Sequence, residues 1–196
     1  MTTMVNRSPA PGGLAASWEK LLLDRALAAL DGWEPARRVD AVSADMQQAY
    51  ERCADITSRH SRTFYLASGL LPPAKRLAVR ALYAFCRVSD EIVDRAGGDP
   101  AAELAAWRER VLSPDAGGDD VARAWADARA RYRIPQLYVE QLIDGVAADL
   151  RRRRYDTFAE LAEYCYGVAC TVGLMSMHFI GFSGVAAVPY AIKLGV

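Results

Sequence analysis

Apolar positions recur along the chain with the spacing of α-helices, most clearly over residues 73–94. Pro72 and Pro73 stand at the start of this segment, where proline suits a first helical turn, and Gly97 and Gly98 follow its end. At about 100° per residue, one side of the segment is continuously apolar. That side holds Leu77, Ala78, Ala81, Leu82, Phe85, Val88, Ile92 and Val93. The pattern predicts an amphipathic helix with one buried face.

The opposite face of this helix carries charged and aromatic side chains. Tyr83, Arg87, Asp90 and Asp94 fall at i, i+4, i+7 and i+11, within an arc of roughly 60°. A solvated polar face explains such an arc. However, Asp90 and Asp94 repel one another unless a cation lies between them, and a tyrosine ring can stack on an apolar ligand. The pattern alone therefore leaves a solvent face and a cation-binding face both open.

Several other segments share the helical period and are separated by short polar breaks. Ser43 is expected to cap the helix that follows it, and Thr157 with Glu160 matches a capping box. The predicted helices cover residues 15–31, 43–59, 100–112, 119–133, 135–152, 158–180 and 186 onward. No segment alternates like a β-strand, so the predicted fold class is all-α.

The chain divides into a leading segment and one helical domain. Residues 1–14 are rich in Thr, Ser, Pro and Gly and predict a disordered tail. Residues 15–31 predict a short amphipathic helix that docks on the core or touches a membrane surface, and its mixture of acids and bases favours docking. We therefore assign residues 1–40 to a tail plus helix and residues 41–196 to a single domain. That length suffices for a sizeable core.

Composition excludes some classes of function. Lys plus Arg and Asp plus Glu both total 24, and this balance argues against a nucleic-acid-binding protein. The basic run at residues 151–154 fits the solvated C-terminal end of a helix better than an anion site. The four cysteines lie in apolar patterns without a C-x-x-C pair, which indicates small buried residues in a reducing compartment. No export signal stands at the N-terminus.

One long stretch has no formally charged residue. It runs from Tyr164 to Ile192, long enough to raise the possibility of a transmembrane helix. Its four glycines and Pro189 favour a buried helix–break–helix pair instead. His178 lies within this stretch and is expected to be a satisfied histidine in or near the core.

Two blocks of sequence resemble the phytoene/squalene synthase family. The first comprises His60-Ser-Arg-Thr-Phe64, Leu70-Leu71-Pro72, Ala81 to Arg87, and Asp90-Glu-Ile-Val-Asp94. The second comprises Arg154 to Phe158 and Tyr164 to Met175. Together they lie in the family's order over residues 45–196. The resemblance implies an isoprenoid-synthase-type helical bundle around a central cleft.

The resemblance also implies an activity, with phytoene synthases of bacteria as the best match. The expected reaction is head-to-head condensation of two geranylgeranyl diphosphates to phytoene, through a cyclopropylcarbinyl diphosphate, in carotenoid biosynthesis. It would require Mg²⁺, or Mn²⁺ in its place, and no NADPH. Condensation of farnesyl diphosphate, as in squalene or dehydrosqualene synthase, is the first alternative. The second alternative is a non-catalytic relative, which would bind prenyl diphosphate, a partner subunit or a membrane.

Carried over residue by residue, the resemblance assigns a role to each matching side chain. Asp90 and Asp94 would form the first aspartate motif and hold the metal, and Tyr83 and Tyr164 would join them in catalysis. The expected substrate-binding residues are His60, Phe64, Ser68, Arg87, Ala169, Val172 and Gly173. Among these, Ser68 would form the floor of the tunnel, where its small size favours the longer substrate. We interpret Val168 and Met175 as plain core residues.

The sequence departs from the family pattern in two ways. Cys170 replaces a usual glycine, which puts a side chain at a tight helix approach beside the tunnel. A second Asp-x-x-x-Asp is also missing, and Asp144 and Asp149 cannot replace it because residues at i and i+5 lie roughly 140° apart. We therefore expect a bundle that is incomplete at its C-terminus, and a chain that is inactive alone. We further expect a cytoplasmic location, with peripheral contact at the inner membrane face left open.

Overall fold

The fold is described by a computed structural model over residues 15–35, 42–95, 97–113, 116–152 and 154–196. Within these ranges every regular element is a helix, so the predicted all-α class is confirmed. The α-helices are α1 (Ala15–Ala28), α2 (Gln47–His60), α3 (Arg62–Ser68), α4 (Pro73–Asp94), α5 (Pro100–Leu112), α6 (Asp120–Arg131), α7 (Gln136–Ala148), α8 (Phe158–Cys165), α9 (Thr171–Ile180) and α10 (Val188–Gly195). The other regular elements are short. They are three 3₁₀ turns, η1 (Ala44–Met46), η2 (Ala116–Gly118) and η4 (Val185–Ala187), and one π turn, η3 (Tyr166–Cys170), within the same ranges.

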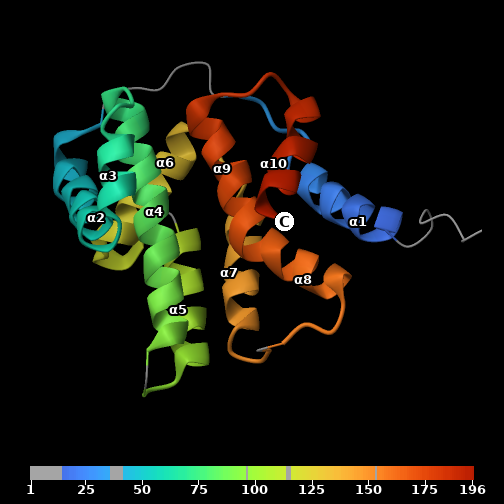
Figure 1. The fold of residues 1–196 in the computed structure, drawn as a ribbon. Coiled ribbons are helices and arrows are strands. Elements are labelled where there is room, and N and C mark those ends of the chain that lie inside the picture. Colours follow the sequence, from blue (N-terminus) through green and yellow to red (C-terminus); the bar gives the residue numbers. More distant parts are fainter. Residues whose placement is uncertain (1–14, 36–41, 96, 114–115, 153) are drawn as a thin grey trace, which may run out of the picture.

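Helix α4 lies at the centre of the bundle. It packs against α2, α3, α5, α6, α7 and α9, and it runs from the top of the view in Figure 1 down to the turn into α5. The predicted apolar face is the buried one, and Phe85 is fully enclosed. The Phe85 ring stacks on Trp125 at 5.0 Å and on Trp107 at 6.4 Å between ring centroids. Trp107 Nε1 also donates to Ser89 Oγ at 2.9 Å, which satisfies both buried polar groups.

Several predicted helix ends are found where local signals placed them. Pro73 opens α4, and the side chain of Asp99 accepts hydrogen bonds from the first turn of α5. Asp119 caps α6 in the same way. The prediction for Ser43 was wrong, because its side chain makes no capping bond and a 3₁₀ turn precedes α2. Helix α7 also ends at Ala148, four residues short of the prediction, in a succession of turns.

The helix predicted over residues 158–180 is interrupted by the π turn η3. At this turn the backbone of Gly167 lies directly against Gly145 of α7. A methyl group added to Gly167 would lie 2.8 Å from the Cα atom of Gly145, closer than real contacts allow. The extra residue of a π turn changes the phase of the helix locally, so α8 and α9 present different faces to the bundle.

The charge-free stretch from Tyr164 onward forms the end of α8, then η3, α9 and α10. No helix in the described part of the chain is long and apolar enough to cross a membrane. Helices α9 and α10 pack against each other instead, as the helix–break–helix interpretation expected. Cys170 is fully buried at a tight approach, as predicted, but it faces α10, where its Sγ donates to the Ile192 carbonyl at 3.3 Å. Met175 is buried and Val168 packs on the core.

His178 is a half-buried residue near the core. Its ring contacts Trp33, Tyr138 and Phe182 edge-on, and burial lowers its pKa to about 4. The imidazole is therefore neutral at physiological pH. The prediction that it is fully satisfied was wrong, because Nδ1 has no hydrogen-bond partner within the described ranges.

Helix α1 docks on the domain, against α8 and α10 (Figure 1). Tyr138 donates to the Ala26 carbonyl at 2.9 Å, and Arg25 pairs with Glu163 at 2.7 Å. The predicted disordered tail, residues 1–14, lies outside the described residues. All four cysteines are free thiols, two of them buried and two half-buried.

The contact between Gly145 and Gly167 generates a stability prediction. The variant Gly167→Ala should be less stable than the original chain by about 1–3 kcal/mol, because the added methyl group forces α7 and η3 apart. Gly173→Ala is the matched control, since its methyl group would meet only the Ala191 carbonyl oxygen at 4.0 Å. Urea denaturation followed by circular dichroism measures both. Equal stability of the two variants would contradict the packing argument.

Candidate functional site

The polar face of α4 is joined to the end of α2 by one carboxylate. Arg87 Nε donates to Glu91 Oε1 at 2.9 Å, and His60 Nε2 lies 3.5 Å from the same oxygen. Each of these side chains is about one-third exposed, at 35–36%. The structure therefore brings together His60 and Arg87, both predicted from the sequence. The structure also places Glu91 in this group, which sequence reasoning missed. Its spacing of four residues from Arg87 could have indicated the ion pair.

Asp90 and Asp94 are exposed one turn apart on the same side of α4. Although Asp90 is exposed at its edge, the protein packed around its carboxyl group partly desolvates it and raises its pKa from the ordinary value, and the negative charge of Asp94 raises it further. Asp149 and Glu91 act in the same direction, while Arg87 opposes them. The face therefore carries an excess of negative charge, which a bound cation would relieve.

Tyr164, which belongs to the second block of the resemblance, lies across from this face. Its hydroxyl donates to Asp149 Oδ2 at 3.1 Å, and its ring lies 5.0 Å from that of Tyr155. Burial and then the bond to Asp149 raise the pKa of Tyr164 to about 12, with a smaller contribution from Asp90. The phenol therefore stays protonated and can donate a hydrogen bond. Asp149, at the end of α7, is a site residue that sequence reasoning considered only as a partner of Asp144 in a second motif.

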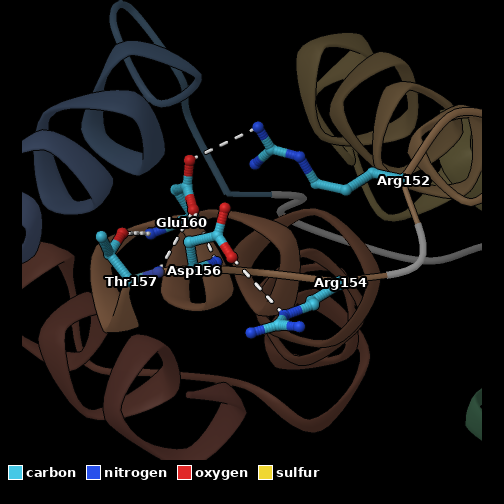
Figure 2. A network of polar contacts seen from close by, with 5 residues as sticks. All are labelled: Arg152, Arg154, Asp156, Thr157 and Glu160. Carbon is cyan, nitrogen blue, oxygen red and sulfur yellow. Dashed lines mark hydrogen bonds and ion pairs between the residues drawn. The ribbon is translucent and has the colours of Figure 1, made fainter.

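The connection from α7 to α8 is fastened by a capping box, shown in Figure 2. Glu160 accepts from the backbone N–H groups of Asp156 at 3.0 Å and Thr157 at 3.2 Å, and its own N–H donates to Thr157 Oγ1 at 3.2 Å. Those two backbone bonds lower the pKa of Glu160. Arg152 pairs with Glu160 at 3.4 Å and Arg154 with Asp156 at 3.5 Å. The two arginines thus pair with carboxylates of the loop. The prediction that the basic run forms the C-terminal end of a helix was wrong, because α7 already ends at Ala148.

The aromatic residues of α3 and α4 meet above the aspartates. The rings of Phe64 and Tyr83 stack at 5.1 Å. Further along α3, Ser68 is buried, and its Oγ accepts from Arg80 Nε at 3.0 Å while donating to the Tyr65 carbonyl at 2.9 Å. The Arg80 guanidinium also lies over the Tyr65 ring, 3.9 Å from its centroid. The predicted floor residue is therefore held by an arginine that sequence reasoning missed.

The remaining predicted tunnel residues lie around η3 and α9. Ala169 is exposed, and Val172 is half-buried and packs on the core. Gly173 is half-buried and faces α10. The structure thus places these three residues on η3 and the start of α9, which follow each other directly. Their role in holding a prenyl tail stays a prediction.

A metal ion would need ligands from outside the protein at this site. No three His, Cys, Asp or Glu side chains group closely enough to hold a metal alone within the described ranges. Mg²⁺ usually binds through one or two carboxylates together with phosphate oxygens of a substrate. Asp90 and Asp94 supply such a pair in a region of excess negative charge, so the residues present fit a Mg²⁺ ion that arrives with a phosphorylated ligand.

Comparison with known proteins gives a consistent result. The family model described as squalene/phytoene synthase matches residues 57–196. The 15-cis-phytoene synthase of Synechococcus elongatus is 44% identical over 151 residues, covering 75% of this chain and 49% of that protein. The 15-cis-phytoene synthase of a Synechocystis species is 41% identical, covering 70% and 42%. The chain thus spans about half the length of the relatives it matches.

Two solved structures share the fold. A ligand-bound dehydrosqualene synthase superposes with a TM-score of 0.70 at 31% identity, covering 77% of this chain and 54% of that one. A squalene synthase from Alicyclobacillus acidocaldarius gives a TM-score of 0.71 at 27% identity, covering 77% and 58%. The helical bundle described above is therefore the fold of these enzymes.

Proposed function

Because the chain belongs to the squalene/phytoene synthase family, we propose that it acts in the head-to-head condensation of two geranylgeranyl diphosphates to phytoene. One arrangement carries the proposal. The aspartates of α4 face the Tyr164–Asp149 pair and lie on the same helix as Arg87, which His60 joins through Glu91. The phytoene synthases among the relatives support the choice of reaction.

The site's own residues fit the two ends of such a substrate. Arg87 presents five N–H donors suited to phosphate oxygens, and His60 lies beside it. A Mg²⁺ or Mn²⁺ ion held by Asp90 and Asp94 would neutralise the diphosphate as it leaves. Tyr164 stays protonated, and its single O–H donates to Asp149 beside the same group.

The stacked rings of Phe64 and Tyr83 would flank the prenyl carbons and stabilise positive charge that develops there. No covalent nucleophile is required. Beyond these rings, the tail would run along α4 away from the aspartates. Arg80, which contacts Ser68, precedes Asp90 by ten residues, or about 15 Å along the helix axis. The small Ser68 favours the longer substrate.

Farnesyl diphosphate, the shorter substrate, is the second candidate. One observation favours it: the Arg80 guanidinium occupies the space next to Ser68 and is held there by two hydrogen bonds. The resemblance of the fold to dehydrosqualene and squalene synthases is compatible with it.

We further propose that the protein is cytoplasmic and touches an anionic membrane surface with the end of the bundle opposite the aspartates. Leu66 is 71% exposed and Leu70 is 90% exposed at the α3–α4 turn, which lies at the top of Figure 1. Residues 61–76 contain no acid, and Lys75 and Arg76 follow Leu70 by five and six residues. Apolar and basic side chains together favour an interfacial position.

The metal-binding role of α4 can be tested by Asp90→Asn. This variant should lose Mg²⁺-dependent binding of a non-hydrolysable prenyl diphosphate while keeping its helical content, because only a surface charge is removed. Isothermal titration calorimetry with and without Mg²⁺ measures the binding. Asp24→Asn, on α1, is the control and should bind as the original chain does. Unchanged Mg²⁺-dependent binding by Asp90→Asn would reject the assignment.

The choice of substrate length can be tested at Ser68. Ser68→Phe should raise the dissociation constant of the 20-carbon analogue relative to the 15-carbon one by about tenfold, because the ring fills the end of the tail site. Ser68→Ala removes the hydroxyl that Arg80 holds but adds no bulk, so it should leave the ratio unchanged. If Ser68→Phe leaves the ratio of the two dissociation constants as it is in the original chain, Ser68 does not limit the length of the prenyl tail that the site accepts.

A further inference from the structure

Glu91 occupies an unusual position for a carboxylate at a site meant for diphosphate. One of its oxygens, Oε1, contacts both of the basic groups assigned to the substrate's phosphates. Arg87 Nε lies 2.9 Å from it and His60 Nε2 lies 3.5 Å from it. The basic groups of this site are thus already paired with an internal anion.

This pairing is open to exchange. All three side chains are about one-third exposed, and exposed ion pairs of this kind contribute little to stability. Glu91 uses the Nε donor of Arg87, and the guanidinium has four further N–H donors with which an incoming phosphate can begin to bind. The contact with Glu91 is therefore easily replaced by a ligand that carries more negative charge.

The surroundings make a metal-free diphosphate a poor competitor. Such a ligand would meet the carboxylates of Asp90 and Asp94, which are exposed one turn apart on the same helix, in addition to Glu91. The carboxylate of Asp149, held by Tyr164, lies opposite them. A ligand that arrives with a divalent cation reverses this repulsion, since the cation is attracted to the same carboxylates. The negative charge near Arg87 therefore disfavours a metal-free diphosphate and favours a diphosphate that carries a divalent cation.

We propose that Glu91 is an internal counter-ion that occupies Arg87 and His60 in the ligand-free protein and makes diphosphate binding depend on metal. Glu91 is thereby a positioning residue that acts through the two basic groups. It excludes metal-free diphosphates and other anions, and it releases Arg87 and His60 when the metal–diphosphate complex binds. This inference rests on the proposed function, because it assumes that these groups receive a diphosphate.

The test is Glu91→Gln, which keeps the shape of the side chain and removes its charge. The probe is inorganic pyrophosphate, titrated by calorimetry with and without Mg²⁺ at fixed ionic strength. Metal-free pyrophosphate should bind the variant about three- to tenfold more tightly than the original chain, because one repelling charge is gone and Arg87 is released. The factor by which Mg²⁺ improves binding should shrink correspondingly. A merely structural role would not strengthen binding.

Asp24→Asn is the matched control, because it removes one carboxylate from another i, i+4 ion pair, with Lys20 on α1. It should leave both affinities unchanged. If the original chain binds pyrophosphate with Mg²⁺ but Glu91→Gln gains no metal-free affinity, or loses it, the counter-ion role is overturned and the proposed function stands. If the original chain binds no pyrophosphate under either condition, the proposed function fails and this inference fails with it.

Discussion

The candidate site depends on the contact of two glycine backbones. Gly145 of α7 and Gly167 of η3 approach so closely that neither has room for a methyl group. Asp149 follows Gly145 by about one helical turn, and Tyr164 precedes Gly167 by about one turn. The contact therefore fixes the separation at which the Tyr164 hydroxyl donates to Asp149. A side chain at either glycine would move this pair away from α4.

The electrostatics of the site follow from what α4 faces. Burial raises the pKa of Asp90, and the negative charges of Asp94 on the same helix and of Asp149 opposite raise it further, so this face carries an excess of negative charge. Glu91 gathers Arg87 and His60 on the adjoining side of the helix. Positive and negative groups thus lie next to each other in the same short stretch. Such an arrangement is suited to a ligand that is itself a pair of opposite charges, a divalent cation with a diphosphate.

Local signals in the sequence predicted much of this structure. The prolines at α4 and the capping box at Thr157 each act within a few residues, and each lies at the observed helix end. The π turn and the Tyr164–Asp149 bond depend on how α7 packs against η3, and no spacing in the sequence encodes that. Arg80 beside Ser68 was missed for the same reason.

The most direct test of the central claim is to locate the metal–diphosphate complex on the protein. Mn²⁺ in the presence of pyrophosphate broadens the backbone amide NMR signals of residues near it. The account predicts that broadening is strongest at Asp90 and Asp94, extends to Asp149 and Tyr164, and weakens along α4 with distance from the aspartates. Broadening centred on the basic residues 151–154, or absent from α4, would show that the aspartates of α4 do not hold the metal.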